Sequence, residues 1–272
     1  MSLPVRLIAT DMDGTLLSSS RVIPRENADA IRAAQEKGIV VAMATGRFPL
    51  NAALVLEQYG LSCPIIGING GHIVDAQIRV IRENFMLPEA AERVQAALEE
   101  AGAEYFLFGR GFICTSRETL YHHSELSDGQ RIAARGITYY HGAGEARRCA
   151  KESVYKFFVH DNVPLAVLRR RLREIPGIQL TQSAPTNVEV MPAGVDKGSG
   201  LRELAAALQI PLEQCMALGD EANDIPMLTA AGYGVAMGNT SPQAKAAARF
   251  VSDSNDACGF ARAVRRYALQ EM

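Results

Sequence analysis

The sequence predicts an α/β fold: a doubly wound parallel sheet whose chain is interrupted by a second, inserted α+β domain. The first observation is a short strand, Val5 to Thr10, which is apolar on both faces, as in the middle of a helix-covered parallel sheet. The second is an order of strand, helix, strand, helix and strand up to about residue 70. The third is the return of this order after about residue 190, behind a middle segment with a different pattern.

Cap and turn residues set the elements expected before the insertion. Pro24 suits the first turn of a helix and Gly38 suits its end. The expected elements are strand Val5–Thr10, helix Pro24–Lys37, strand Ile39–Ala44, helix Leu50–Tyr59, strand Pro64–Ile68 and a hairpin from Gly71 to Asn84. This alternation of strands and helices implies a doubly wound parallel sheet with right-handed crossovers.

Residues 85–189 mix helices with hairpins and are expected to form the separate α+β unit. Its elements are helix Pro88–Ala101, a hairpin across Gly109–Gly111, strand Val154–His160, helix Pro164–Glu174 and short strands near Ile178 and Val188. The first pattern then returns in helix Gly198–Leu208, strand Cys215–Leu218, helix Ala222–Ala231, strand Gly234–Ala236 and a helix from Asp256. Residues 1–84 and 190–272 should therefore form one domain, with crossings near Asn84 and Met191.

Composition and charge narrow the function classes. The chain has 272 residues, 48% of them hydrophobic and 21% charged, so it can bury a substantial core. A net charge of −2 gives no argument for a nucleic acid or an anionic membrane as partner, and no apolar run approaches the ~20 residues of a membrane span. Five scattered cysteines without metal or redox spacing indicate reduced thiols in a cytoplasmic protein. The residues before Asp11 are too few for a signal peptide. The oligomeric state stays open.

Polar groups follow four of the predicted strands. In chain order they are Asp11 and Asp13, Thr45 and Gly46, Asn69 and Gly70, and Asp220 with Asn223 and Asp224. Lys197 lies between the last two groups, at the start of a helix. Ligands of such sheets bind beyond the carboxyl ends of the strands, so these groups should converge on one site.

The residue types at this site point to phosphoryl chemistry. Several carboxylates close together repel one another and need a cation, and hard oxygen ligands favour Mg²⁺. A carboxylate beside such an ion can attack phosphorus, while Asp13 could protonate the leaving oxygen and then activate water. Thr45 and the Gly46 amide suit phosphate oxygens, and Lys197 would neutralise charge during transfer.

Taken together, these motifs resemble the haloacid dehalogenase superfamily. Its first motif is similar to Asp11-Met12-Asp13-Gly14-Thr15-Leu16-Leu17, and the next three are similar to Thr45-Gly46-Arg47, Lys197-Gly198 and Gly219-Asp220-Glu221-Ala222-Asn223-Asp224. The Asn69-Gly70 turn and the run from Gly234 to Asn239 are similar to the Cof-type branch. The resemblance covers nearly the whole chain and is loosest in the inserted domain.

The resemblance implies a role for each matched residue. Asp11 would be the nucleophile and a metal ligand, and Asp13 would be the acid and base, with its backbone carbonyl on Mg²⁺. Asp220 would be the third protein ligand, while Asp224 would hold metal-bound water. Four groups would hold the phosphate: the Met12 amide, Thr45, Gly46 and Lys197. Asn223 would either contact the phosphate as well or orient Lys197.

Spacing places the inserted domain among the motifs. One helix and one strand fit between Thr15 and Thr45, whereas a whole domain fits between Arg47 and Lys197. In the family this placement implies an α/β cap, here residues 85–189, which closes over the catalytic core and selects the substrate. The resemblance thus implies a Mg²⁺-dependent phosphatase that acts on a small phosphorylated metabolite, such as a sugar phosphate or a phosphorylated vitamin, through an aspartyl-phosphate.

Two other functions stay open. A phosphomutase or phosphotransferase would use the same Asp11 and Asp13 but return the phosphoryl group to a sugar. A catalytically silent binding protein could share the fold, although every expected catalytic residue is present. Dehalogenation is disfavoured because it needs no Mg²⁺, and the carboxylates of Asp13, Asp220 and Asp224 would then have no purpose.

Within the inserted domain, residue roles are less defined. His122 and His123 are expected on a polar helical stretch, as exposed histidines rather than substrate contacts. Four arginines are expected on a solvated helix face rather than in a phosphate site: Arg169, Arg170, Arg171 and Arg173. Phe157 and Phe158 are expected in the core rather than as a platform on which a ligand stacks. Asn187 and Glu189 either touch the substrate or belong to a hinge.

Overall fold

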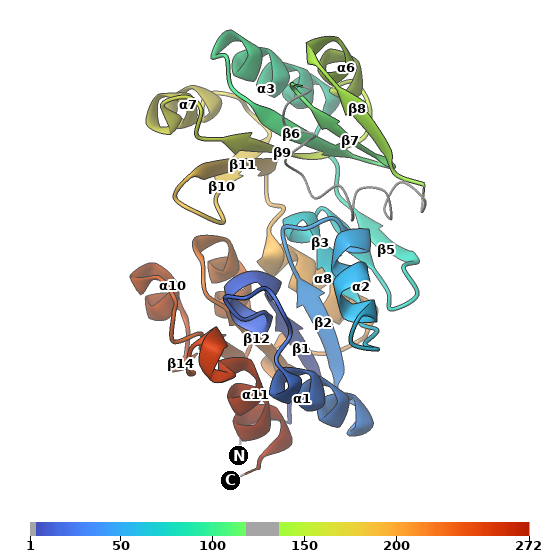
Figure 1. The fold of residues 1–272 in the computed structure, drawn as a ribbon, viewed down its shortest axis with the longest axis vertical. Coiled ribbons are helices and arrows are strands. Elements are labelled where there is room, and N and C mark those ends of the chain that lie inside the picture. Colours follow the sequence, from blue (N-terminus) through green and yellow to red (C-terminus); the bar gives the residue numbers. More distant parts are fainter. Residues whose placement is uncertain (1–3, 118–135, 272) are drawn as a thin grey trace. The chain divides into compact units, whose positions relative to one another are not determined.

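The computed structural model describes residues 4–117 and 136–271, which form two compact units. The core unit comprises the chain up to Glu83 and from Asp196, and the cap unit comprises Asn84–Val195 (Figure 1). The second crossing thus lies later than the boundary after residue 189 that the sequence suggests. The reason is that β11 (Asn187–Pro192) is hydrogen-bonded between two other strands of the cap unit.

The core unit is built on one mixed sheet. Its strand order among the described residues is β14–β13–β12–β1–β2–β3–β4–β5. The strands are β1 (Leu7–Thr10), β2 (Val40–Ala44), β3 (Ile65–Gly67), β4 (His72–Val74), β5 (Val80–Glu83), β12 (Cys215–Gly219), β13 (Tyr233–Ala236) and β14 (Phe250–Val251). The strands from β14 to β3 are parallel, with Leu7 opposite both Cys215 and Val40, while β4 and β5 add an antiparallel edge.

Helices cover both faces of this sheet (Figure 1). On one face lie α1 (Arg25–Glu36), α2 (Pro49–Glu57), α11 (Gly259–Ala263) and the π-helical turn η6 (Val264–Leu269). On the other lie α8 (Lys197–Ala207), α9 (Ile225–Ala230) and α10 (Pro242–Ala247). Strand β1 shows why, because Ile8 enters one apolar cluster while Leu7 and Ala9 enter the other, all three fully buried. Burial on both faces, at ~1.5–3 kcal/mol for a large apolar side chain, requires two helical layers. The predicted α/β class is confirmed.

The cap unit has its own sheet and core. Its strand order among the described residues is β10–β11–β9–β6–β7–β8, antiparallel except for the β7–β8 pair. The remaining strands are β6 (Tyr105–Gly109), β7 (Phe112–Thr115), β8 (Thr138–His141), β9 (Val154–His160) and β10 (Ile178–Thr181). Helices α3 (Pro88–Glu100), α6 (Ala143–Cys149) and α7 (Leu165–Leu172) pack on one face of this sheet (Figure 1).

The longer elements match the sequence analysis, and β9 has the expected bounds. Four short elements are absent from the prediction: β8, α6, α10 and β14. Each spans at most two helical turns or a few strand residues, so it shows too little periodicity to be recognised. His122 and His123 lie outside the described residues.

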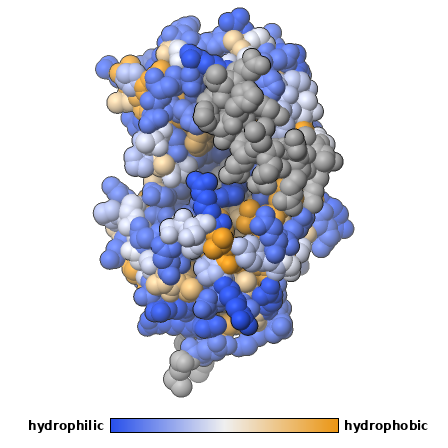
Figure 2. Space-filling model, in the orientation of Figure 1, coloured by the Kyte–Doolittle hydropathy of each residue, from blue (hydrophilic) through white to orange (hydrophobic). Residues whose placement is uncertain are grey.

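The visible surface is largely hydrophilic (Figure 2). Within residues 4–117 and 136–271, the large apolar residues that are exposed are scattered: Val22, Val80, Leu87, Val167 and Val251. Single exposed apolar side chains are ordinary. In the described ranges, no helix is both long and apolar enough to span a bilayer.

Candidate functional site

Three carboxylates gather at the carboxyl end of the core sheet. Asp11 directly follows β1 and Asp220 directly follows β12, and these two strands are adjacent and parallel. Asp224 ends a short 3-10 turn, η4 (Ala222–Asp224). Carboxylate oxygens of Asp11, Asp220 and Asp224 lie within 4.8 Å of one another, and all three residues are buried. The structure thus brings together three of the residues that the sequence predicts for a metal site.

Lys197 enters the same cluster from the first position of α8. Its Nζ donates to Asp11 Oδ1 at 2.7 Å and to Asp224 Oδ1 at 2.6 Å, and its side chain is only 1% exposed. Burial opposes the charge of Lys197, but attraction by Asp11 and Asp224 outweighs burial and raises the pKa of the ammonium. The lysine is therefore held charged between two carboxylates.

A capping box fixes where α8 begins. The Asp196 carboxylate accepts from the Ser199 amide at 2.7 Å, and Ser199 Oγ accepts from the Asp196 amide at 2.9 Å. Gly198, which follows Lys197, lies close to α9: a Cβ at this position would be 2.5 Å from the Pro226 carbonyl oxygen. Local capping and a small residue together place Lys197 at the cluster.

The cluster carries more negative than positive charge. Burial, followed by the charge of Asp224, raises the pKa of Asp220 to about 7. Burial raises the pKa of Asp11 well above its usual value, against the attraction of Lys197 and with the help of Asp224 and Asp220. One ammonium does not balance three carboxylates, so a further cation would relieve the repulsion. The all-oxygen donor set fits a hard divalent ion such as Mg²⁺.

The surroundings of Asp220 and Asp224 differ in what they leave for a metal. Both oxygens of Asp224 already accept hydrogen bonds: Oδ1 from Lys197, and Oδ2 from the amides of Asp220 at 2.9 Å and Glu221 at 3.0 Å. Asp224 is thus fixed by the lysine and by two backbone amides. Asp220 Oδ1 accepts from Thr15 Oγ1 at 2.7 Å, which orients that carboxylate.

Gly14 allows the loop after β1 to wrap closely around Asp220. Its φ is +81°, and a Cβ there would lie 2.2 Å from Asp220 Oδ2. Both the backbone conformation and the contact therefore exclude a side chain. Met12, two positions earlier, buries its side chain in the core, which leaves its backbone as the group that could meet a phosphate.

The side chain of Asp13 lies apart from the carboxylate cluster. It sits past the strand end, in the turn η1 (Met12–Leu16), and is 53% exposed. Arg47 donates to both of its oxygens, from Nε at 2.8 Å and from Nη2 at 2.5 Å. Burial opposes ionisation of Asp13, but the hydrogen bonds and charge of Arg47 prevail and lower its pKa. The second predicted carboxylate is thus held ionised by an arginine whose role the sequence analysis did not assign.

The loops after β2 and β3 complete the site. Thr45 is buried at the end of β2, with Gly46 beside it, and its carbonyl accepts from the Asn69 amide at 2.9 Å. Asn223 Nδ2 donates to Asn69 Oδ1 at 3.4 Å. Asn223 therefore contacts the loop after β3, whereas Asp11 and Asp224 orient Lys197. Asn69 and Arg47 lie in two motifs recognised in the sequence, Asn69-Gly70 and Thr45-Gly46-Arg47. Their place in these motifs is the feature from which their presence at the site could have been predicted.

The structure places several cap residues for which the sequence analysis stated an expectation. Arg169 is partly buried and donates to Gln182 Oε1 and to the Asn187 carbonyl, while Arg171 pairs with Glu100. Asn187 and Glu189 are buried in β11, inside the cap sheet rather than at the crossing between units. Phe157 is fully buried, as expected, whereas Phe158 is only half-buried.

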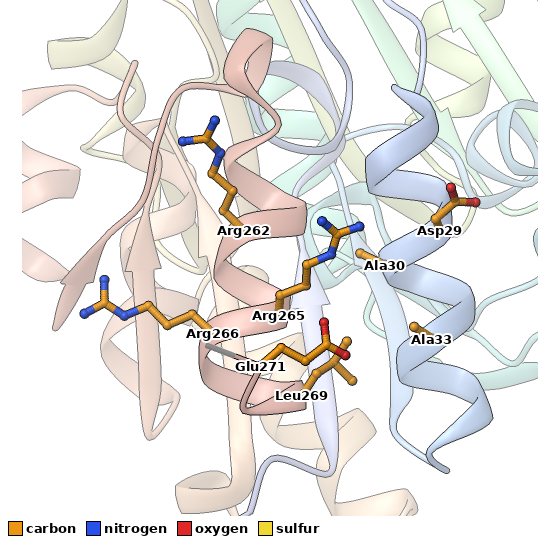
Figure 3. A pocket seen from close by; sticks show the side chains of 8 residues that line it. All are labelled: Asp29, Ala30, Ala33, Arg262, Arg265, Arg266, Leu269 and Glu271. Atoms are coloured by element: carbon orange, nitrogen blue, oxygen red, sulfur yellow. The ribbon is translucent and has the colours of Figure 1, made fainter.

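A separate pocket of about 550 Å³ lies in the core unit between α1 and the C-terminal turns (Figure 3). Arg265 reaches toward α1, whereas Arg262 and Arg266 point away from it. Arg262 pairs with Asp253 at 3.0 Å, and Arg266 lies over the Tyr267 ring. The arginines do not converge, and the lining contains none of the residues of the carboxylate cluster.

The chain is similar over most of its length to named phosphatases and to a solved structure. The chain is 28% identical to the 5-amino-6-(5-phospho-D-ribitylamino)uracil phosphatase YcsE of Bacillus subtilis (strain 168), over 97% of this chain and 96% of the relative. It is 32% identical to the HMP-PP phosphatase of Klebsiella pneumoniae (strain 342), over 89% and 87%. A solved structure of a haloacid dehalogenase-like hydrolase from B. subtilis matches with a TM-score of 0.85 and 30% identity, over 96% of this chain and 99% of that one.

The family comparison is equally extensive. A family model described as haloacid dehalogenase-like hydrolase matches residues 8–264. This range contains every motif on which the resemblance was based, from Asp11 to Asn239. The chain belongs to the haloacid dehalogenase-like hydrolase family.

Proposed function

We propose that the chain is a Mg²⁺-dependent phosphatase that hydrolyses a small phosphorylated metabolite through an aspartyl-phosphate on Asp11. The observation that carries this proposal is the buried ammonium of Lys197, which lies between Asp11 and Asp224 with Asp220 alongside. A buried carboxylate held next to a fixed positive charge suits attack on a phosphoryl group, whose oxygens carry negative charge in the transition state.

In the first step a carboxylate oxygen of Asp11 attacks phosphorus, and the bond from phosphorus to the ester oxygen breaks. Protonated Asp13 gives its proton to that leaving oxygen. In the second step ionised Asp13 takes a proton from water, whose oxygen attacks the same phosphorus and releases inorganic phosphate and free Asp11. Arg47 favours the ionised form of Asp13, which the second step needs. The first step needs protonated Asp13, so the ion pair between Asp13 and Arg47 must loosen for that step.

Asp11, Asp220 and the Asp13 carbonyl would hold Mg²⁺, and Asp224 would hold its bound water. When bound, the ion would neutralise the carboxylates and the charge on the phosphoryl oxygens. The Met12 amide, Thr45, Gly46, Lys197 and Asn223 would bind the phosphate.

The substrate class rests on the relatives. Two have names that specify phosphorylated compounds, 5-amino-6-(5-phospho-D-ribitylamino)uracil and HMP-PP, and a structural relative with 25% identity is described as a sugar phosphatase. We therefore propose a small phosphorylated metabolite, selected by the cap unit, with no nucleic acid or membrane as partner. None of the five cysteines forms a disulfide, which supports a reducing compartment such as the cytoplasm.

The test is release of inorganic phosphate from a panel of sugar phosphates, nucleotides, phosphorylated vitamins and an aryl phosphate, with Mg²⁺ and with EDTA. Release that requires Mg²⁺ would support the proposal. Substrate loss without phosphate release, together with phosphoryl transfer between sugars, would favour a mutase. No reaction with any compound would favour a silent binding protein.

A further inference from the structure

Asn239 ends the run from Gly234 to Asn239, a motif of the sequence that the proposed mechanism does not use. It lies in residues 237–241, which follow β13 and which we call the β13 loop. The amide of Gly238 donates to the Asp253 carbonyl at 2.9 Å, and a Cβ at Gly238 would lie 2.7 Å from the Ser254 amide nitrogen. The backbone that carries Asn239 is therefore held closely against the chain after β14.

The side chain of Asn239 joins two segments that are distant in the sequence. Its Nδ2 donates to the Gly14 carbonyl at 2.9 Å, and its Oδ1 accepts from the Asn255 amide at 3.0 Å. Asn239 is exposed, so water could replace either bond at little cost in stability. The main effect of the two bonds is therefore to fix where Gly14 lies.

Two buried asparagines hold the same loop further along the chain. Asn27 Nδ2 donates to the Leu16 carbonyl at 2.9 Å. Asn255 Nδ2 donates to the Leu17 carbonyl, also at 2.9 Å. Both bonds lie toward α1, whereas Asn239 holds the earlier part of the loop, next to the proposed acid and base.

A short path leads from the bond of Asn239 to the carboxylate cluster. The peptide whose carbonyl Asn239 binds joins Gly14 to Thr15. Thr15 is fully buried, and its Oγ1 donates to Asp220 Oδ1 at 2.7 Å. Gly14 packs so closely that a Cβ there would lie 2.2 Å from Asp220 Oδ2. A displaced Gly14 carbonyl would therefore displace the groups that orient Asp220.

The β13 loop also binds the backbone of Asp220. Thr240 Oγ1 donates to the Asp220 carbonyl at 2.6 Å, and the Ser241 amide donates to the same oxygen at 3.1 Å. Neighbouring residues of one loop thus hold both Gly14 and Asp220. The β13 loop therefore sets the separation of two segments that carry proposed metal ligands.

We propose that Asn239 is a positioning residue of the metal site. Through the peptide between Gly14 and Thr15, it keeps the Thr15 hydroxyl in place to orient Asp220. The same bond fixes the turn that contains Asp13. In this role Asn239 touches neither the substrate nor the metal. The inference rests on the proposed function, because it assumes that Asp220 binds Mg²⁺.

Asn239→Ala and Asn162→Ala form a matched pair. Asn162 is also exposed, donates from Nδ2 to the Gly102 carbonyl at 3.0 Å and accepts at Oδ1 from the Glu104 amide at 2.8 Å. It belongs to the cap unit, whereas the carboxylate cluster belongs to the core unit. Both variants should lower Tm by a similar small amount. Only Asn239→Ala should raise the calorimetric Kd for Mg²⁺, by about tenfold, as when a group behind a metal ligand is removed.

Steady-state kinetics separate positioning from folding. With an aryl phosphate at saturating Mg²⁺, Asn239→Ala should lower kcat by about tenfold and change KM by less than about twofold. Asn162→Ala should leave kcat unchanged. A merely structural Asn239 would lower Tm without changing kcat or the Kd for Mg²⁺.

A double-mutant cycle tests the path through Thr15. Thr15→Val removes the hydroxyl that orients Asp220 and should raise the Kd for Mg²⁺ by about tenfold. Adding Asn239→Ala to Thr15→Val should then weaken binding by less than about twofold more, because both substitutions break the same path. Thr15→Ser keeps the hydroxyl, so the full effect of Asn239→Ala should return in that background.

The inference is overturned if Asn239→Ala leaves the Kd for Mg²⁺ unchanged, or if Asn162→Ala raises it equally. Independent, multiplicative effects in the cycle would overturn the path through Thr15. A wild type that binds Mg²⁺ but hydrolyses no phosphate ester would contradict the phosphatase function alone, and the calorimetric comparison would still decide the role of Asn239. A wild type that binds no Mg²⁺ would overturn both.

Discussion

At the scale of single residues, the site depends on buried charges that constrain one another. Lys197 is held by two carboxylates, and its charge partly offsets the burial that raises the pKa of Asp11. Asp13, the other essential carboxylate of the proposed mechanism, has a different environment and an arginine partner. Two carboxylates two residues apart thus have pKa values shifted in opposite directions, Asp11 upward by burial and Asp13 downward by Arg47. Attack by Asp11 needs its ionised form, which a bound cation would favour.

The nucleophile can be tested by Asp11→Asn. An amide oxygen can still accept from Lys197 but cannot attack phosphorus, so kcat should fall by at least about a thousandfold with little change in Tm. Phosphate release and thermal unfolding are the measurements, with Asp253→Asn as a control on the surface of the same unit. Activity at a tenth of the wild-type rate would contradict the assignment.

Gly14 provides a test of how tightly the loop fits Asp220. Gly14→Ala and Gly60→Ala both place alanine at a positive φ, but a Cβ at Gly60 meets no atom within 4 Å, whereas one at Gly14 meets Asp220. Gly60→Ala should cost about 1–2 kcal/mol from backbone strain. Gly14→Ala should cost more and should weaken Mg²⁺ binding, measured by chemical denaturation and calorimetry. Equal effects of the two substitutions on Mg²⁺ affinity would show that the contact is unimportant.

At the scale of elements, the ends of helices and strands position the chemistry. Helix α8 begins at the catalytic lysine of the proposed mechanism because the N-cap residue of its capping box, Asp196, lies one residue earlier. The carboxyl ends of β1 and β12 coincide because these strands are parallel and in register, which brings Asp11 beside Asp220. The long elements were predictable because each contains several repeats of its own periodicity.

Removal of the α8 cap should separate positioning from stability. Asp196→Ala and Ser241→Ala each remove an N-cap side chain, the first from α8 and the second from α10. Both should lower the free energy of unfolding by about 1 kcal/mol. Only Asp196→Ala should also reduce kcat, because only α8 begins at the lysine. Denaturation and steady-state kinetics measure the two effects, and equal activity in both variants would argue against positioning by the cap.

At the scale of the whole molecule, each unit has its own apolar core. The core unit buries one cluster on each face of its sheet, and the cap unit buries a third cluster beneath α3, α6 and α7. The carboxylate cluster belongs to the core unit alone. Metal binding should therefore stabilise the core unit and depend on the ionisation of its own carboxylates.

Stability should respond to pH and Mg²⁺ together. In EDTA, Asp220 has a folded pKa of about 7 against about 4 when unfolded, so its contribution to stability is complete below pH 4 and is lost as pH rises through 7. Mg²⁺ binds the ionised form, so the increase in Tm caused by Mg²⁺ should be larger at pH 8 than at pH 5.5. Asp220→Asn should remove most of the increase. An increase that is the same at both pH values would contradict the assignment of Asp220.

The linear order of motifs was sufficient to predict the α/β core and the convergence of Asp11, Lys197, Asp220 and Asp224, although 186 positions separate Asp11 from Lys197. The reason is that parallel strands align their carboxyl ends, so residues that follow such strands meet wherever they lie in the chain. The pairing of Asp13 with Arg47 was not predictable in this way. It depends on how the loop after β1 turns toward the loop after β2, and this follows from contacts between distant segments rather than from local pattern.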